Sequence, residues 1–238
     1  MTTPEERTTR LFADGADLTG ILALLQDERI SGFTTNPTLM RQAGLADYTA
    51  FARELLEHVT THPVSFEVFA DDPDEIRRQA RLIAGWADNV YVKIPITTTS
   101  GEPLTDVVRE LSSEGVRVNV TAMFTIKQVD AVTAAVLDGA PSYLSIFAGR
   151  VADAGVDPVP LMREALEIMS AAPRAECIWA SPREVFNYVQ AQSIGCHIIT
   201  MTHDLLRKLD GLGKDLDQFS LETVQMFRRD ATAAGYTL

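Results

Sequence analysis

The sequence predicts an α/β protein, a single (β/α)8 barrel followed by one additional C-terminal helix. Runs rich in β-branched and aromatic residues recur about every 27 residues, which is the length of one strand and one helix with short loops. The segments between these runs have the apolar spacing of amphipathic helices. The chain contains neither a Rossmann GxGxxG motif nor a P-loop motif, which favours a closed barrel over an open doubly wound sheet.

Eight short segments are expected to be strands, because they are rich in residues that favour extended backbone. They cover residues 9–14, 32–37, 64–70, 89–95, 117–124, 143–149, 176–181 and 197–202. After the fifth segment, Val129, Val132 and Val136 share one face of a predicted helix, and Thr125 precedes them as a candidate N-cap. Pro73 lies near the start of another helix, where its missing N–H group does no harm.

Length and charge restrict the classes of protein that fit the sequence. One (β/α)8 barrel commonly fills 238 residues, and no linker-like segment divides the chain, so we expect residues 1–238 to form one domain. The net charge of −12 argues against a nucleic-acid partner. Residues 1–10 hold charges and threonines, and no apolar run reaches about 18 residues, so we expect no secretory signal, no membrane span and a cytoplasmic location.

Several predicted strands carry polar residues in the phase that points into the barrel. Val90, Val92 and Ile94 share the apolar phase of the fourth strand, so Lys93 is expected to point inward. A lone Asp or Asn at a strand end is usually a turn or cap residue, and a lone inward Lys can simply pair with a carboxylate. Six strands with such groups favour an active site at the C-terminal face instead. The same alternation places these residues inward on the other five strands: Phe12, Asp14, Thr34, Asn36, Ser65, Glu67, Asn119, Thr121, Ser145 and Phe147.

These groups suit chemistry on a carbonyl compound. Desolvation in a barrel interior lowers the pKa of a lysine and frees its amine for attack, which makes Lys93 a candidate for Schiff-base formation. Asp14 and Glu67 are candidates for proton transfer. No cluster of histidines or carboxylates predicts a metal site, so we expect neither a metal nor a cofactor. Cys177 and Cys196 are expected to be small core residues, and the four histidines structural or surface residues.

At these positions the sequence resembles the transaldolase family, in the short-chain branch that also includes fructose-6-phosphate aldolase. The resemblance runs from about residue 10 to the last helix, and the order and spacing of its motifs make it more specific than any one motif. The matching segments are LFAD at 11–14, TTNP at 34–37, VKIP at 92–95, NVT at 119–121, FAGR at 147–150 and ASPR at 180–183.

The resemblance implies a barrel in which Lys93 forms a Schiff base with a ketose donor. Asp14 would take the proton of the C4 hydroxyl as the bond between C3 and C4 breaks, and the resulting dihydroxyacetone enamine would attack an aldehyde acceptor. Glu67 would move protons through a water molecule that Thr121 also holds. No metal or cofactor is implied, and the reaction would belong to carbohydrate metabolism in the pentose phosphate pathway. The other implied substrate ligands are Asn36, Asn119 and Ser145 for the hydroxyls of the three-carbon unit, and Arg150, Ser181 and Arg183 for the phosphate.

Three positions favour a transaldolase over the aldolase of the same family. These are Glu67, Asn119 and Phe147, where the aldolase has Gln, a residue other than Asn, and Tyr. We therefore expect transfer of a dihydroxyacetone unit from a ketose phosphate to an aldose phosphate. The alternatives are a lyase that uses free dihydroxyacetone, a transaldolase for another anionic or unphosphorylated sugar, and a barrel that binds its ligand without turnover. The chain departs from the family pattern at Gly15, where Ser or Thr is usual, at Ile146 and Pro182, and in the loop 97–103.

A last helix is predicted at 220–234, after the complete barrel. Val224, Phe227 and Ala231 form one apolar stripe on it, which requires a cover. The helix either closes its own barrel or covers a neighbouring subunit. The resemblance implies the second, because short-chain members form rings of five that pair into decamers, with the last helix crossing to a neighbour. We therefore expect a homo-oligomer, a pentamer or a decamer.

Overall fold

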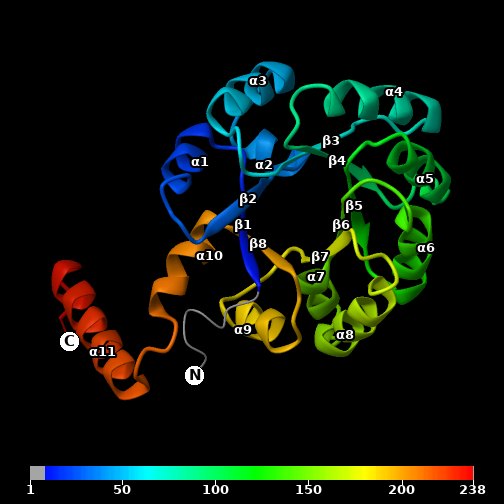
Figure 1. Ribbon diagram of the computed structural model, residues 1–238. Coiled ribbons are helices and arrows are strands. Elements are labelled where there is room, and N and C mark those ends of the chain that lie inside the picture. Colours follow the sequence, from blue (N-terminus) through cyan, green and yellow to red (C-terminus); the bar gives the residue numbers. More distant parts are fainter. Residues whose placement is uncertain (1–8, 238) are drawn as a thin grey trace.

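The computed structural model describes residues 9–237, and its eight strands close into one parallel barrel surrounded by helices (Figure 1). Each strand pairs with its neighbours in the chain, and the last strand returns to pair with the first. The predicted (β/α)8 barrel and its eight strands are confirmed. Their bounds are β1 Arg10–Asp14, β2 Ile30–Thr34, β3 Val64–Glu67, β4 Val90–Pro95, β5 Val118–Met123, β6 Ser142–Ile146, β7 Ala175–Trp179 and β8 Ile198–Thr202.

Helices connect consecutive strands, and two of the connections contain two helices each. After the last strand, the helix His203–Lys208 is followed by a short 3-10 turn, Leu209–Gly211, and then by the C-terminal helix. The helices are α1 Leu18–Leu24, α2 Pro37–Gln42, α3 Tyr48–His58, α4 Pro73–Ala84, α5 Thr105–Ser113, α6 Ile126–Val136, α7 Ala148–Asp153, α8 Pro158–Met169, α9 Phe186–Ser193, α10 His203–Lys208 and α11 Leu216–Ala233.

Local sequence signals explain where these elements begin. Thr125 caps α6 in a reciprocal capping box, because its side chain accepts from Gln128 N while the Gln128 side chain accepts from the N–H of Thr125. Several predicted strands were too long at their C-terminal ends. Asn36 and Phe147 are not strand residues but the N-cap residues of α2 and α7, so β2 and β6 end before them.

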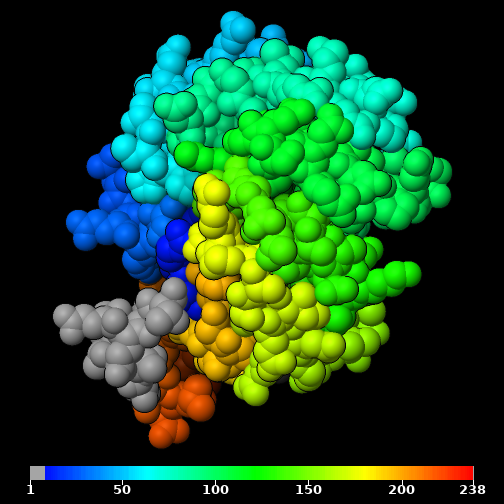
Figure 2. All heavy atoms as spheres, turned by 45° about the vertical axis from the view of Figure 1, so that its right-hand side comes forward, coloured from blue at the N-terminus to red at the C-terminus, as the bar shows by residue number. Residues whose placement is uncertain are grey.

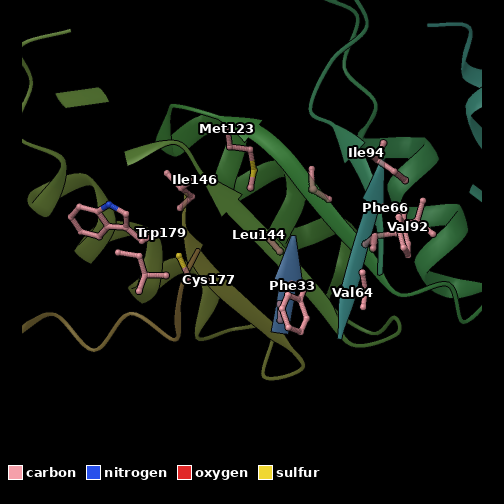
Figure 3. Packing of buried hydrophobic residues seen from close by; sticks show 14 of the residues in the cluster. Phe33, Val64, Phe66, Val92, Ile94, Met123, Leu144, Ile146, Cys177 and Trp179 are labelled. Carbon is pink, nitrogen blue, oxygen red and sulfur yellow. The ribbon is translucent and has the colours of Figure 1, made fainter. Parts of the chain in front are cut away.

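The main hydrophobic core lies between the barrel and the helices around it. Apolar side chains of the outward strand phase fill this layer, as Figure 3 shows for several strands. Cys177 and Cys196 are buried there as free thiols, as predicted. The residues that Figure 3 labels are Phe33, Val64, Phe66, Val92, Ile94, Met123, Leu144, Ile146, Cys177 and Trp179.

A second, smaller apolar cluster fills the barrel interior, and we call it the inner aromatic cluster. Phe12 packs edge-on against Tyr143 with ring centroids 5.6 Å apart, and Tyr91 stacks on Tyr143 at 4.0 Å. Each of these aromatic residues lies two positions before a polar inward residue of the same strand. Because side chains alternate along a strand, the cluster forms the layer beneath the polar groups. The members of the cluster are Phe12, Tyr91, Tyr143, Ile178, Ala180 and Ile198.

The C-terminal helix α11 does not close its own barrel. It extends away from the ring of helices in Figure 1, and in Figure 2 the orange start of this segment projects below the rounded body. None of its residues is buried, and Val224 and Phe227 are 60% and 62% exposed. The helix begins at Leu216, four residues before the predicted start, because the Asp215 side chain caps it by accepting from Gln218 N.

Within residues 9–237, no helix has both the length and the apolar character needed to cross a membrane.

Candidate active site

A pocket of about 470 Å³ lies at the C-terminal ends of the barrel strands. This is the face on which (β/α)8 enzymes carry their active sites. The lining comes from both halves of the chain, so the pocket exists only when the barrel is closed. Most of the predicted site residues line it, namely Asp14, Asn36, Glu67, Lys93, Thr121, Ser145, Phe147, Arg150 and Ser181.

Lys93 is the buried cation of the pocket. The residue is 7% exposed, and its Nζ donates a hydrogen bond to the carbonyl of Thr35 at 2.9 Å. The Oε2 atom of Glu67 lies 3.8 Å from the same Nζ. The parallel register of β3 and β4 places Glu67 directly opposite Lys93, which brings the two side chains together. A buried amine with a carboxylate beside it is suited to proton exchange and to attack on a carbonyl.

Two carboxyl groups share this pocket, and both have raised pKa values. Burial raises the pKa of Asp14 above its ordinary range, against the opposing effects of the Lys93 charge, the Thr34 hydrogen bond and the His203 charge. Burial likewise raises the pKa of Glu67, while Lys93 lowers it and the Asp14 charge raises it. A carboxyl group with a raised pKa accepts and releases protons more readily near neutral pH. The pair therefore has the properties of acid–base groups.

Asn119 lies behind the pocket wall rather than in the lining. Its Nδ2 donates to Ser65 Oγ at 2.9 Å, and its Oδ1 accepts from Ser145 Oγ at 2.7 Å. Asn119 is fully buried and Ser145 lines the pocket, so the amide holds the serine hydroxyl in place. These three side chains come from β3, β5 and β6 and link the strands across the barrel interior.

Thr121 and Asn36 both have hydrogen-bonding capacity left for a ligand. Thr121 Oγ1 is buried, and among the described residues it has no hydrogen-bond partner. Asn36 caps α2 through its Oδ1, which accepts from Leu39 N at 3.0 Å. Because the cap uses the carbonyl oxygen, the NH₂ group of Asn36 remains for another acceptor.

The two predicted phosphate-binding arginines are placed differently. Arg150, on α7, lines the pocket, with its guanidinium 4.9 Å from the centre of the Phe147 ring. Arg183 lies outside the lining. Its Nε donates to both carboxylate oxygens of Asp153 at 2.9 Å, and its NH1 group donates to Ser181 Oγ at 2.9 Å. Arg183 is therefore connected to the pocket through Ser181, and its guanidinium already forms an ion pair with Asp153.

Gly149 lets α7 approach the loop after β7. A Cβ atom at position 149 would lie 1.6 Å from the carbonyl oxygen of Ser181, so any side chain there would displace the loop. Ser181 itself has a φ of 59°, in the left-handed region that favours glycine. This close approach brings Arg150 and Ser181 to the same side of the pocket, and it explains the glycine of the FAGR segment.

The departure at Gly15 also has a structural reason. The imidazole of His203, at the start of α10, occupies the space that a side chain at position 15 needs: its Nε2 lies 2.8 Å from the place of a Gly15 Cβ. Gly20 leaves room for the other side of the same ring. Burial lowers the pKa of His203 below its ordinary value. The serine or threonine that is usual after the Asp would collide with this histidine.

The sequence analysis missed several polar residues at the site: Thr200, Thr38 and Gln42 in the pocket lining, and Asp153 beside it. Thr200, on β8, lies beside Thr34 with their hydroxyl oxygens 2.6 Å apart. Thr200 has the inward phase of its strand, so the alternation used for Lys93 could have found it. Asp153 lies on α7, and nothing in the local sequence indicates its contact with Arg183, which is 30 residues away. Across the described part of the chain, no group of three or more His, Cys, Asp or Glu residues is arranged to hold a metal ion.

Sequence comparisons with known proteins indicate one family. A sequence profile of the family described as Transaldolase/Fructose-6-phosphate aldolase matches residues 11–238. The chain is 36% identical over 201 residues to a "Probable transaldolase" of Dehalococcoides mccartyi, covering 84% of this chain and 89% of the relative. Proteins with the same description from Streptococcus pyogenes serotype M5 and Streptococcus equi subsp. zooepidemicus are 34% identical, with the same coverage. The chain belongs to the transaldolase/fructose-6-phosphate aldolase family.

Proposed function

We propose that this protein is a transaldolase that transfers a dihydroxyacetone unit from a ketose phosphate to an aldose phosphate through a Schiff base on Lys93. The observation that carries the proposal is the buried Lys93 in one pocket with two carboxyl groups of raised pKa, Asp14 and Glu67. The family match and the printed descriptions of the relatives support it.

The first step joins the donor to the enzyme. The neutral amine of Lys93 attacks the C2 carbonyl of the ketose, and the resulting carbinolamine loses water to give the protonated Schiff base. A proton must reach the leaving oxygen. Glu67, at 3.8 Å from Nζ, and the free hydroxyl of Thr121 are the groups proposed to move it through a water molecule.

The second step breaks the bond between C3 and C4. Asp14 takes the proton of the C4 hydroxyl, C4 becomes the aldehyde of the departing aldose, and the bond electrons move through C3 into the Schiff base to leave an enamine. The enamine then attacks the aldehyde of the acceptor, whose new hydroxyl receives the proton back from Asp14. Hydrolysis of the new Schiff base frees the product and restores Lys93. No metal or other cofactor takes part in the proposed steps.

The remaining predicted residues are assigned to substrate recognition. Asn36 and Ser145 have groups in the pocket lining for the hydroxyls of the three-carbon unit, and Asn119 supports Ser145 from behind. Phe147 forms an apolar side of the pocket. Arg150 and Ser181 are proposed to bind the phosphate directly, with Arg183 held beside Ser181 as the second cation.

Transfer is preferred over simple aldol cleavage because this chain has Glu67, Asn119 and Phe147, as transaldolases do. The family also includes an aldolase, so a lyase that releases free dihydroxyacetone is the second candidate. Release measured with and without an aldehyde acceptor separates the two. Fast release without acceptor supports the lyase, and ligand binding without turnover across a panel of sugars supports a binding protein.

Four broader expectations remain proposals. The exposed apolar stripe of α11 supports a homo-oligomer, a pentamer or decamer, in which this helix covers a neighbouring subunit. The organisation of residues 1–238 as one domain, the cytoplasmic location and the role in the pentose phosphate pathway stay predictions of the sequence. Residues 1–8 of that domain, and of the segment predicted to lack a secretory signal, lie outside the described residues.

Reductive trapping tests the Schiff base. Borohydride added with a ketose phosphate is expected to attach a three-carbon unit to Lys93, located by peptide mass spectrometry. The Lys93→Ala variant is expected to take no label and to lose turnover, whereas Lys127→Ala, on α6, keeps both. Failure to label the wild-type protein with any ketose phosphate, or labelling that survives Lys93→Ala, contradicts the proposal.

A further inference from the structure

The carboxylate of Asp14 is joined to two threonine hydroxyls on neighbouring strands. Thr34 Oγ1, on β2, donates to Asp14 Oδ1 at 2.8 Å. Thr200 Oγ1, on β8, lies 2.6 Å from Thr34 Oγ1. β1 pairs with both β2 and β8, so all three side chains point inward from one continuous part of the barrel wall. Both threonines are largely buried, at 2% and 6% exposed, and each faces the pocket with its small remaining surface.

The number of available protons fixes the direction of this chain. A threonine hydroxyl has one proton to donate and two lone pairs to accept with. When Asp14 is ionised, the only proton of Thr34 goes to the carboxylate, which has none of its own. The short contact between the hydroxyls must then use the proton of Thr200. The order is therefore Thr200 to Thr34 to Asp14, with every donor directed towards the negative charge.

The chain opposes the effect of burial on Asp14. The charged groups around this carboxyl are Lys93 on β4, Glu67 on β3 and His203 at the start of α10. Lys93 and His203 favour the ionised form, whereas Glu67 and burial disfavour it. Of these, Lys93 is the group that changes charge and bonding in the proposed reaction, because it becomes a Schiff base. The hydroxyl chain is a support for the ionised carboxylate that stays unchanged through those steps.

We propose that Thr34 and Thr200 are positioning residues that keep Asp14 ionised and hold Oδ1 against the barrel wall, which leaves Oδ2 to accept the proton of the sugar hydroxyl. The inference rests on the proposed function, since it concerns how the proton acceptor of that reaction is prepared. In the proposed reaction, neither threonine contacts the reacting atoms. Thr34 acts on Asp14 directly, and Thr200 acts by fixing the rotation of the Thr34 hydroxyl.

Valine has nearly the volume of threonine and carries a methyl group in place of the hydroxyl, so Thr34→Val and Thr200→Val test the chain. In the ligand-free protein, the pKa of Asp14 is measured by carbon-13 NMR of labelled aspartate carboxyl groups, with the Asp14 signal assigned from Asp14→Asn. Loss of a hydrogen bond to a charged group raises the pKa of an acid, so Thr34→Val is expected to raise it by about one unit. Thr200→Val shifts it less, in the same direction.

The kinetic readout is the pH dependence of transfer. The acidic limb of the kcat profile is expected to move to higher pH by the same amount in Thr34→Val, with little change in KM. Thr34→Ser restores the hydroxyl and is expected to restore the wild-type profile. Thr133→Val is the matched control, because Thr133 is a buried threonine of α6 whose hydroxyl has no partner in the described residues.

The outcomes separate this inference from the proposed function. A pKa of Asp14 that is unchanged in both valine variants overturns the inference, and so does a shift that Thr34→Ser retains in full. If Thr34→Val does not fold, the Thr200→Val titration alone decides, since it leaves the bond from Thr34 to Asp14 in place. The NMR titration needs no substrate. Failure of borohydride to label Lys93 in the wild-type protein therefore removes the proposed function without deciding what the threonines do to Asp14.

Discussion

The Nζ atom of Lys93 lies 3.8 Å from Oε2 of Glu67, across two neighbouring strands in register. This distance is longer than a hydrogen bond, and Lys93 instead donates to the carbonyl of Thr35. The Glu67 carboxyl is therefore close enough to exchange a proton with Lys93 through one water molecule. It does not hold the Lys93 amine in a direct hydrogen bond. Glu67 is 16% exposed at its side chain, so the exchange takes place in a largely enclosed space.

Replacement of Glu67 by glutamine is expected to lower kcat by about 10² to 10³, because proton transfer during formation and hydrolysis of the Schiff base loses its acid–base group. The shape of the side chain is kept, so KM for both sugars is expected to change little. Steady-state kinetics of Glu67→Gln beside Glu164→Gln, an exposed glutamate of α8, check this. A wild-type kcat in Glu67→Gln would show that another group moves these protons.

The sequence could predict which strand residues of the site point into the barrel, because side chains alternate along a strand. This alternation correctly sent Lys93, Asp14 and Glu67 inward, because that pattern depends only on backbone geometry. The alternation does not tell how far below the pocket surface an inward side chain lies. Asn119 shares the inward phase and was expected at the substrate, but it lies behind Ser145. Contacts that depend on helix packing, such as Asp153 with Arg183, need the folded chain.

The length of the predicted strands shows a second limit of the sequence. Asn36 continues the polar phase of β2, and its identity suits either a strand end or a helix cap. The helix that starts at Pro37 decides for the cap, and β2 ends at Thr34. The exposure of α11 was not predictable from its stripe, since the same spacing fits a helix that closes its own barrel.

The raised pKa of Asp14 predicts a conflict between stability and function. An acid with a raised pKa in the folded state binds more protons folded than unfolded between the two pKa values, so the free energy of unfolding falls as pH rises through that range. Asp14→Asn is therefore expected to unfold at higher temperature than wild type at neutral pH, and to lose transfer activity. At a pH below the ordinary carboxyl pKa, the stability difference is expected to vanish.

Thermal unfolding measured against pH checks this sign. Asp130→Asn, an exposed position on α6, is the control and is expected to follow the wild-type curve. Lower stability of Asp14→Asn at neutral pH would mean that attraction to Lys93 and the Thr34 hydrogen bond outweigh the cost of burial.

Gly149→Ala is expected to weaken phosphate recognition rather than the chemistry at Lys93. The added methyl group overlaps the carbonyl of Ser181, so the loop after β7 must move, and Ser181 moves with it. We expect KM for a phosphorylated acceptor to rise by about tenfold, the loss of roughly one charge-assisted hydrogen bond. An unphosphorylated acceptor is expected to show a much smaller change in KM.

Gly211→Ala is the control for that substitution, because no atom lies within 4 Å of its added Cβ. Equal losses for phosphorylated and unphosphorylated acceptors would show that the displaced loop disturbs the whole pocket. Borohydride labelling of Lys93 by the donor reports separately whether the Schiff base still forms.

The apolar stripe of α11 is the part of the described surface that most needs a cover. Leu216, Phe219, Val224 and Phe227 are each more than half exposed, although the helix is held by its cap and by an ion pair between Lys214 and Glu222. Apolar side chains gathered on one exposed helix are typical of a protein interface. A second copy of the chain is the cover that the family resemblance implies.

We expect light scattering to return a multiple of the 26.1 kDa chain mass, five or ten chains, at working concentration. The double substitution Val224→Glu with Phe227→Glu places two charges in the stripe, and burying them in an interface is costly, so the assembly is expected to dissociate. Gln225→Glu with Arg229→Glu, off the stripe by helical spacing, is the matched control and keeps the wild-type mass.

Truncation after Asp215 is expected to act like the stripe variant. A wild-type mass near 26.1 kDa refutes the oligomer, and a truncated chain that still assembles shows that another surface holds the subunits together.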